Sequence, residues 1–207
     1  MHIGGMICDL AKAFGCVNHK ILLVNLHFYV IQGEYEDWFR LYLTNRRQKV
    51  EIKLPNSTQN FFSDWSILKH ELSEGSILGL LSFIIYINDL PLRINSVSEP
   101  ILFAHETSVI ISSRNFEDFY SVSCLVLSHM IKWFAANNLV QNFDKIKKIK
   151  FITKNSSPSI SHTGYKEKDI EGTVNTKFIG LQTDNHIKWK YHIKEMILLL
   201  SGAYYAE

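Results

Sequence analysis

The chain has 207 residues and a mass of 24.0 kDa, with 22 Lys and Arg against 20 Asp and Glu, so its formal net charge is only +2. A chain of this length can bury a sizeable core, and 46% apolar with 20% charged residues is typical of a folded protein, which argues against intrinsic disorder. The near balance of charge does not by itself indicate a nucleic-acid partner, so any basic surface has to be local. Two local basic clusters stand out, Arg46, Arg47 and Lys49 in one and Lys145, Lys147, Lys148 and Lys150 in the other. Runs of this kind form a solvated face more often than a binding site.

The cysteines and the apolar runs give expectations about the compartment. Cys8, Cys16 and Cys124 have neither the spacing of a disulfide framework nor that of a metal site, which favours a reducing environment. The longest apolar run, Ile77 to Ile87, is about eleven residues long and too short to span a bilayer. No secretory or transit segment is recognisable at the N-terminus. We therefore expect an intracellular protein, in the nucleus or cytoplasm, with no membrane partner; the oligomeric state is not predicted.

The first half of the chain predicts a strand, two helices, a hairpin and a further helix. Residues 3 to 9 predict a short buried strand that ends at Asp9, and residues 20 to 30 predict a helix. Apolar residues then recur at i, i+3, i+4, i+7 and i+8, the spacing of one helical face: Tyr35, Trp38, Phe39, Tyr42 and Leu43. Residues 49 to 67 predict an antiparallel pair with one solvent-exposed face. Ser76 is expected to cap a helix that is apolar nearly all round, and therefore buried, up to about Asn88.

The second half predicts a hairpin, a long helix, two strands and a last helix. The stretch "ILFAHETSVI", residues 101 to 110, indicates two strands joined by a tight turn at His105 and Glu106. Residues 116 to 134 keep one apolar helical face, with Asn115 as the N-cap. Residues 149 to 153 and 174 to 183 predict strands, residues 155 to 164 a loop, and residues 186 to 200 a helix. This mixed order favours an α+β fold with an antiparallel sheet covered by helices on one side.

Asp9 is ambiguous when it is taken alone, because a carboxylate at the end of a buried strand either binds a metal or caps the next helix. Its context is more informative. Five segments occur in order: "DLAKAFGCVNH" (9 to 19), "EGSILGLLSFIIYINDL" (74 to 90), "FAHET" (103 to 107), "NLVQNFDKIKK" (138 to 148) and "KFIGLQTD" (177 to 184). Together they closely resemble the palm motifs of reverse transcriptases from non-LTR (LINE-type) retrotransposons. The resemblance covers essentially the whole chain.

The resemblance implies a fold, a domain organisation and an activity. The fold would be a reverse transcriptase palm-like antiparallel sheet packed on helices, over residues 1–184, with a partial fingers insertion at about 20–67. Residues 185–207 would begin a thumb or connection helix. The activity would be that of an RNA-directed DNA polymerase, a nucleotidyltransferase that uses an RNA template, a DNA primer and Mg²⁺ or Mn²⁺.

The resemblance also implies roles for single residues. Asp9 and Glu106 would bind the metal, and Asp9, His105, Glu106 and Lys145 would be the catalytic positions. Phe14 would screen the sugar 2′ position, and Glu74 and Gly75 would lie against the incoming nucleotide. Phe178 and Gly180 would belong to the primer-gripping turn. Such a metal site needs carboxylates that converge from different strands, because Mg²⁺ prefers hard oxygen ligands.

This chain departs from the family pattern at positions that matter for catalysis. His105 and Glu106 stand where the family has two aspartates, so only Asp9 and Glu106 remain as carboxylates, and an imidazole is a poor magnesium ligand. Gly15 replaces an Asp, Glu74 replaces a Gln beside the nucleotide phosphates, and Ser73 and Leu80 replace prolines. A family enzyme also carries fingers before the first motif and a full thumb after the fifth. We therefore expect an inactive, truncated remnant, a pseudoenzyme with impaired cation binding.

Two other interpretations stay open. The first is a non-catalytic module that binds nucleic acid through its lysines. The second is an unrelated metal-binding protein that uses His105 and Glu106, although an adjacent His-Glu pair lacks a metal-ligand spacing.

Overall fold

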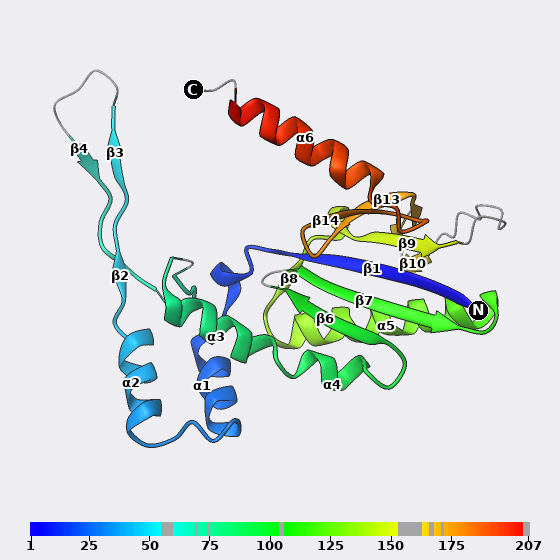
Figure 1. Ribbon diagram of the computed structural model, residues 1–207. Helices are drawn as coiled ribbons and strands as arrows, with labels where there is room; N and C mark the ends of the chain where they lie inside the picture. Colours follow the sequence, from blue (N-terminus) through cyan, green and yellow to red (C-terminus); the bar gives the residue numbers. More distant parts are fainter. Residues whose placement is uncertain are drawn as a thin grey trace. The chain divides into compact units, whose positions relative to one another are not determined.

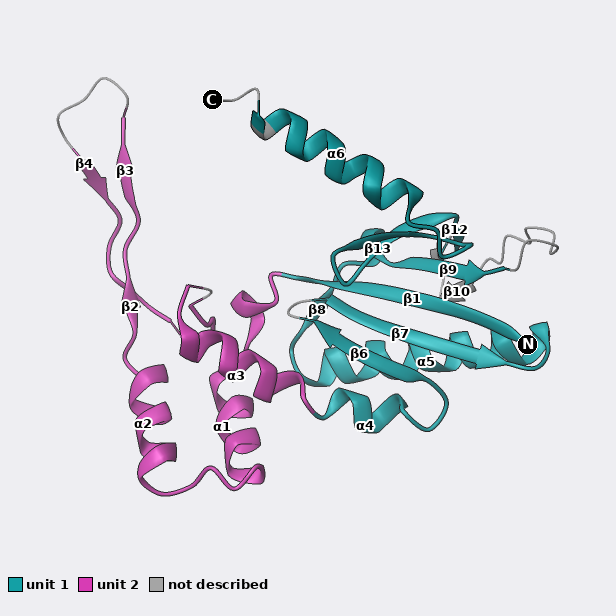
Figure 2. Cartoon of the chain, in the orientation of Figure 1, with its two compact units in different colours: residues 1–11, 89–207 teal, residues 12–88 magenta. Residues whose placement is uncertain are grey.

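A computed structural model describes residues 1–54, 60–68, 70–73, 75–103, 106–152, 163–165, 168–170 and 172–204. The chain forms two compact units (Figure 2). Unit 1 consists of Met1–Ala11 and Asp89–Glu207, and unit 2 is the intervening segment Lys12–Asn88. Unit 2 is therefore an insertion between the first strand of unit 1 and the rest of that unit.

Unit 1 is built on a central sheet (Figure 1). The strands of its main path lie in the order β12-β9-β1-β7-β6, and β8 pairs with the end of β1. Their bounds are β1 His2–Ala11, β6 Glu99–Phe103, β7 Glu106–Ser113, β8 Val140–Gln141, β9 Lys147–Phe151 and β12 Gly172–Thr173. All pairs are antiparallel except β12 with β9, so the sheet is mixed. The predicted α+β class is confirmed, and the parallel pair is an addition to it.

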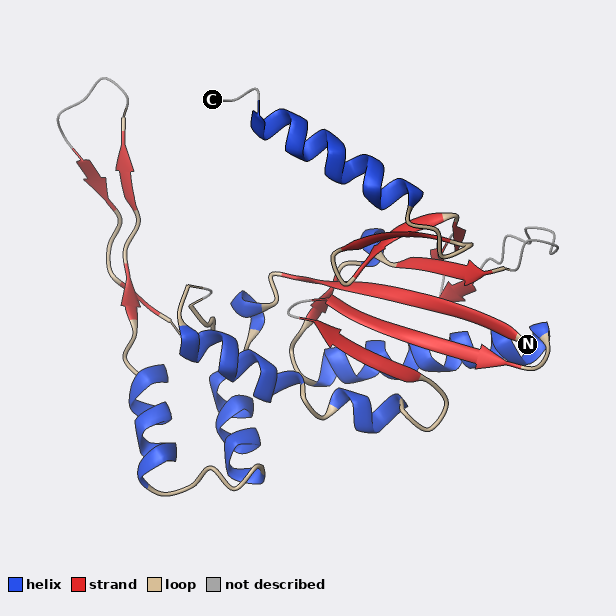
Figure 3. Ribbon diagram, viewed as in Figure 1, coloured by secondary structure: helices blue, strands red, loops and turns tan. Residues whose placement is uncertain are grey.

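Two helices lie on one side of this sheet (Figures 1 and 3). They are α4, Leu90–Ile94, and α5, Phe116–Ala136, which contacts β7 and β1. The Asn115 side chain caps α5 as predicted, because its Oδ1 accepts a hydrogen bond of 2.8 Å from Asp118 N. Gly4 permits the close approach of α5 to β1, since a Cβ there would lie 2.6 Å from Phe119 Cζ. The core of unit 1 is thus the layer between the sheet and α5.

The remaining elements of unit 1 follow the sheet in sequence. They are β10 Thr163–Tyr165, β11 Lys168–Ile170, β13 Asn175–Phe178, β14 Leu181–Asp184 and α6 Lys190–Tyr204. The single strand predicted for residues 174 to 183 is wrong, because β13 and β14 form a hairpin. Positive φ angles of 49° at Ile179 and 77° at Gly180 turn the chain between them, as tight two-residue hairpin turns require. Of the loop predicted for residues 155 to 164, residues 155 to 162 lie outside the described residues, and the prediction is wrong for Thr163 and Gly164, which begin β10.

Unit 2 combines three helices with an extended hairpin (Figures 1 and 2). Its helices are α1 His19–Phe28, α2 Glu34–Leu43 and α3 Ile77–Ile87, preceded by a 3₁₀ turn at Phe14–Cys16. Its strands are β2 Arg47–Gln48, β3 Glu51–Lys53, β4 Asn60–Phe62 and β5 Ser66–Ile67. Helix α1 contacts both α2 and α3, so the three helices share one small core.

Two predictions for unit 2 need correction. The strand pair within residues 49 to 67 was expected to bury one face, yet every residue of β2 to β5 is exposed. Helix α3 was expected to be buried all round, yet Ile77, Leu80 and Ile84 are exposed. Apolar composition does not by itself supply a covering layer, and burial depends on which other segments the fold brings near. The N-cap of α3 is Ser76, as predicted.

Two stretches of the described chain, Ile77–Ile94 and Phe116–Ala136, are long and apolar enough to cross a membrane by length and composition alone. The first comprises two separate helices, α3 and α4, and the second is α5, which packs against the sheet. Core helices of globular proteins pass the same test, so this is a weak indication. The absence of a membrane partner stays a prediction.

Candidate active site

Asp9 and Glu106 lie directly opposite each other on neighbouring strands. The register of β1 and β7 pairs Asp9 with Glu106, and adjacent strands are about 5 Å apart. Residues in such a pair point to the same face of the sheet. Gly4 faces α5, and side chains alternate along a strand, so Asp9 and Glu106 lie on the face that points away from α5. The predicted convergence of two carboxylates from distant segments is confirmed for this pair.

The position of Glu106 differs from the prediction in one respect. Glu106 is the first residue of β7 and pairs with Phe103 of β6, so it belongs to a strand. Ser108, two residues along β7, donates a hydrogen bond of 3.5 Å from its Oγ to Glu106 Oε1. His105 lies outside the described residues. Its predicted place beside Asp9 therefore stays a prediction.

The chain segment after β8 brings the side chain of Lys145 next to Asp9. Strand β8 pairs with Leu10 and Ala11 of β1, and the next amide, Asn142 N, donates a hydrogen bond of 3.0 Å to Asp9 O. The 3₁₀ turn Phe143–Lys145 follows and contacts β1. Lys145 Nζ ends 2.7 Å from Asp9 Oδ2. The fourth motif is thus brought against the first, at a sequence separation of 136 residues.

The donor set of this site fits a divalent cation poorly. Mg²⁺ prefers six oxygen ligands and is usually held by carboxylates with water and substrate oxygens. The described residues contribute two carboxylates, and the ammonium of Lys145 already occupies Asp9 Oδ2. Within the described ranges, no group of three or more His, Cys, Asp or Glu side chains is arranged to hold a metal ion. The described residues alone therefore do not form a site for a divalent cation.

The second basic cluster is divided between the two faces of the sheet. Lys147 of β9 is exposed, whereas Lys148, which pairs with Met6, is 2% exposed on the side of α5. Lys148 Nζ lies 5.3 Å from the ring centroid of Phe119 in α5. Burial lowers the pKa of Lys148 to about 8. The solvated face expected for this cluster is wrong for Lys148, because side chains alternate along a strand.

The predicted nucleotide-contacting residues belong to unit 2. The rings of Phe14 and Phe83 pack at a centroid distance of 4.7 Å, and Phe14 O accepts a hydrogen bond of 2.9 Å from Leu72 N. Gly75 lies in the turn before α3, and Glu74 lies outside the described residues. The roles of Phe14, Glu74 and Gly75 toward a nucleotide stay predictions.

The predicted primer-gripping residues lie in the β13–β14 hairpin of unit 1. Phe178 ends β13 and pairs with Leu181, and Gly180 occupies the turn between the strands. At the end of β14, Asp184 Oδ1 accepts hydrogen bonds of 3.0 Å from His186 N and 2.7 Å from Lys188 N, which fix the chain before α6. Strand pairing and hydrogen bonds therefore define the geometry of this hairpin. Its contact with a primer stays a prediction.

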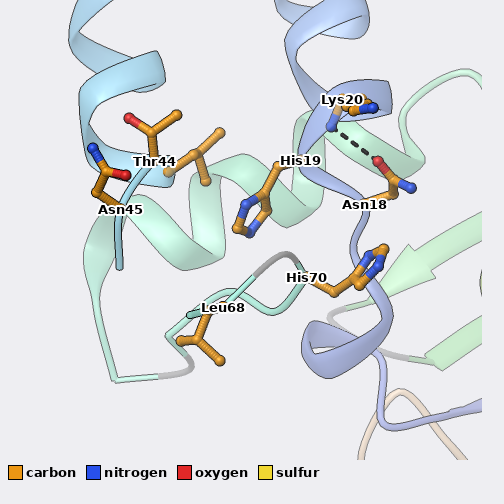
Figure 4. Close-up of a pocket in the computed structure, with 8 residues that line it drawn as sticks. Asn18, His19, Lys20, Thr44, Asn45, Leu68 and His70 are labelled. Atoms are coloured by element: carbon orange, nitrogen blue, oxygen red, sulfur yellow. Dashed lines mark hydrogen bonds between the residues drawn. The ribbon is translucent and has the colours of Figure 1, made fainter. Parts of the chain in front are cut away.

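A cavity of about 510 Å³ opens in unit 2, and sequence patterns gave no sign of it (Figure 4). Its lining includes His19 from α1, Thr44 after α2, and His70 from the segment before α3. The ring of His19 is held by a hydrogen bond of 2.9 Å between its Nε2 and Glu71 O. None of the residues predicted for the active site lines this cavity.

Comparison with known proteins gives similarity at the level of structure. No family model matches the chain, and no curated protein matches it. Three solved structures of telomerase from Candida tropicalis superpose on it. The apo form truncated from its C-terminal domain has a TM-score of 0.55 and 11% identity, covering 88% of this chain and 34% of that one. The apo form has a TM-score of 0.56 and 10% identity, covering 88% and 31%.

The third structure is telomerase in complex with the TWJ fragment of telomeric RNA. It has a TM-score of 0.53 and 8% identity, covering 89% of this chain and 29% of that one. The chain thus spans about a third of the length of these telomerases. At such identities the likeness concerns the fold alone. The chain therefore shares its fold, α+β with a mixed sheet, with part of these telomerase structures.

Proposed function

We propose that this chain is the reverse transcriptase domain of a non-LTR retrotransposon that has lost polymerisation and still binds nucleic acid. The retrotransposon origin is supported by the order of the five sequence motifs, and a reverse transcriptase domain in general is supported by the likeness of the fold to telomerase structures. The pairing of Asp9 with Glu106 on neighbouring strands carries the proposal, because it places the first and third motifs side by side. Lys145 of the fourth motif reaches the same carboxylate.

The loss of polymerisation is supported by the chemistry of the same residues. Phosphoryl transfer from a nucleoside triphosphate relies on two divalent cations that clamp the attacking and leaving oxygens. The sequence has His105 where the family has a metal-bridging Asp, and it has the acidic Glu74 where the family has a Gln that the resemblance sets beside the nucleotide phosphates. The ion pair between Lys145 and Asp9 further reduces the negative charge available to a cation. Each defect opposes the stabilisation of charge on which this transition state depends.

Binding of nucleic acid is the part of the function that these defects leave possible. The telomerase complex with telomeric RNA supports an RNA partner for this chain, and a DNA primer follows from the resemblance to reverse transcriptases. On a chain with a net charge of +2, such binding is weak and depends on local basic surface. Its affinity falls with salt, with a log-log slope of about −0.7 to −0.9 for each phosphate neutralised.

A primer-extension assay tests this proposal. The purified chain is given an RNA template annealed to a DNA primer, with Mg²⁺ or Mn²⁺, and the Asp9→Ala variant is the control. We expect no nucleotide incorporation by either protein, and salt-dependent binding of the template–primer by both. Template-dependent incorporation that disappears in Asp9→Ala would show that the site is catalytically competent. Absence of any binding at low salt would reject the nucleic-acid function as a whole.

A further inference from the structure

The hairpin of unit 2 formed by β2 to β5 carries two different faces. The register pairs Glu51 with Phe62 and Ile52 with Phe61, so the two phenylalanines point to opposite sides. Lys49 lies on the side of Phe62, since its Nζ is 4.1 Å from the Phe62 ring centroid and 5.3 Å from that of Trp65. We call this side, with Lys49, Phe62 and Trp65, the aromatic face. The other side, with Ile52 and Phe61, is the apolar face.

The rings of the aromatic face are accessible. Phe62 and Trp65 expose 53% and 62% of their surface, although aromatic side chains are normally among the most buried residues of a fold. The hairpin backbone nevertheless has a defined geometry. Ser63 N donates a hydrogen bond of 2.9 Å to Val50 O, and Leu68 N donates one of 2.9 Å to Arg46 O. The two rings are therefore attached to a backbone whose strands are hydrogen-bonded to each other.

The hairpin also concentrates positive charge. Residues 46–67 contain four cations, Arg46, Arg47, Lys49 and Lys53, against two acids, Glu51 and Asp64, an excess of two positive charges. This excess equals the net charge of the whole chain, which is +2. Glu51 is in addition engaged by the side chain of Asn60, whose Nδ2 donates to Glu51 Oε1. The remainder of the chain is thus neutral on balance, and the hairpin is a local basic surface.

We propose that the aromatic face of this hairpin binds single-stranded nucleic acid by stacking bases on Phe62 and Trp65, with Lys49 and neighbouring cations on the phosphates. The inference rests on the proposed nucleic-acid function and locates its binding surface. Unpaired bases stack on exposed aromatic rings regardless of sequence, and basic groups beside the rings follow the backbone. A duplex hides its base faces, so the rings favour a single strand. A protein partner could contact the apolar face as well as the aromatic face. The positive charge of the hairpin, by contrast, favours a partner that carries phosphates.

The chain offers a matched control for this proposal. Phe61 and Phe62 are adjacent, of the same type and almost equally exposed, at 54% and 53%, but they lie on opposite faces. The full chain and its Phe61→Ala, Phe62→Ala, Trp65→Phe and Trp65→Ala variants are titrated against a fluorescently labelled 12-nucleotide single strand, and anisotropy is measured. Far-UV circular dichroism and thermal unfolding confirm that each variant remains folded. Because both phenylalanine rings are exposed, neither truncation removes a buried contact.

We expect Phe62→Ala and Trp65→Ala each to weaken binding by about 5- to 150-fold, the range that corresponds to loss of one stacked base. Trp65→Phe retains most of the affinity, and Phe61→Ala binds within about twofold of the unmodified chain. Lys49→Gln lowers the salt slope by about 0.7, as loss of one phosphate contact on a single strand does. Equal weakening by Phe61→Ala and Phe62→Ala, or no weakening by Phe62→Ala and Trp65→Ala, overturns the proposal. If Phe62→Ala and Trp65→Ala bind as well as the unmodified chain, the proposed nucleic-acid function still holds and only its location on this hairpin is rejected. If the unmodified chain does not bind at all, both the location and the nucleic-acid function are rejected.

Discussion

Lys148 shows how one residue of a strand acquires a role that its neighbours do not have. It stands between Lys147 and Ile149 in β9, and the alternation of the strand turns it toward α5. There its ammonium lies 5.7 Å from the ring centroid of Tyr120 as well as near Phe119. Cation–π contacts compensate part of the cost of removing the charge from water. The remaining cost lowers the pKa of Lys148 to about 8.

The free energy of unfolding is therefore expected to depend on pH through Lys148. The folded-state pKa of about 8 lies below the ordinary value of 10.5, so below pH 8 both states carry the charge and the folded state bears the full cost of burial. Between pH 8 and 10.5 the unfolded state binds more protons, and stability rises with pH. Lys148→Met removes this cost, so its advantage over the unmodified chain is greatest below pH 8 and shrinks toward pH 10.5.

Urea unfolding of both proteins at pH 7, 9 and 10.5 measures this difference directly. Comparing the two proteins at each pH cancels the contributions of other titrating groups, among them Cys8, whose burial raises its thiol pKa to about 12. A difference that does not change with pH would mean that Lys148 keeps an ordinary pKa in the folded protein.

The start of helix α3 is fixed by one contact that the sequence predicts, the Ser76 cap, and by further contacts that the sequence does not predict. Ser76 Oγ accepts a hydrogen bond of 2.9 Å from Gly79 N, which is the predicted cap. The same oxygen lies 2.9 Å from the Tyr42 hydroxyl of α2 and 3.1 Å from Ser73 O. The cap therefore also joins two helices of unit 2, and this link between α2 and α3 arises from tertiary packing.

Gly79 in the first turn of α3 is expected to resist replacement by alanine. Alanine is favoured over glycine in a helix by about 1 kcal/mol. A Cβ at position 79 would, however, collide with the carbonyl oxygen of Ser73. We expect Gly79→Ala to destabilise the protein by about 1 to 3 kcal/mol, the usual cost of overpacking. Gly202→Ala in α6 is the control, since a Cβ there meets nothing within 4 Å and its effect is expected to be neutral or stabilising.

Thermal or urea unfolding of the two variants provides the comparison. If Gly79→Ala is as stable as Gly202→Ala, the turn between Ser73 and Ser76 moves away from the new Cβ without cost. The close approach of position 79 to the Ser73 carbonyl oxygen then does not affect the free energy of unfolding.

Viewed as a whole, the described chain exposes many large apolar side chains. Helix α6 is an example, with Ile193, Met196, Ile197, Leu198, Leu199 and Leu200 all exposed. Contiguous apolar surface of this kind binds hydrophobic dyes and promotes self-association. We expect the native chain to enhance the fluorescence of anilinonaphthalene sulfonate and to sediment as concentration-dependent oligomers. The double variant Ile197→Lys, Leu200→Lys is expected to reduce both signals.

Glu195→Lys on the same helix is the control for added positive charge, and it should leave dye binding unchanged. A native chain that binds no dye and stays monomeric at high concentration would show that this apolar surface is covered in solution.

The sequence alone determined the class of the fold, most of its helices and strands, and the order of the acidic and basic positions in the candidate site. These features follow from local periodicity, capping residues and motif order, which a linear pattern records directly. Periodicity predicted one strand in place of the β13–β14 hairpin because the turn places Ile179, a β-branched residue, at positive φ, although the motif resemblance implied a turn at Phe178 and Gly180. The exposure of the β2–β5 hairpin was missed because alternation predicts which residues share a face and not whether anything covers it.

Tertiary structure decided which side chains meet. The register of β1 against β7 sets Asp9 opposite Glu106, and the turn after β8 brings Lys145 to within 2.7 Å of Asp9. Whether Lys147 or Lys148 of the same basic run is buried depended on the face that α5 covers. Such outcomes depend on long-range register and on packing between distant segments, which fix positions to within a few ångströms. A local sequence pattern contains the period of a strand but not the identity of its partner.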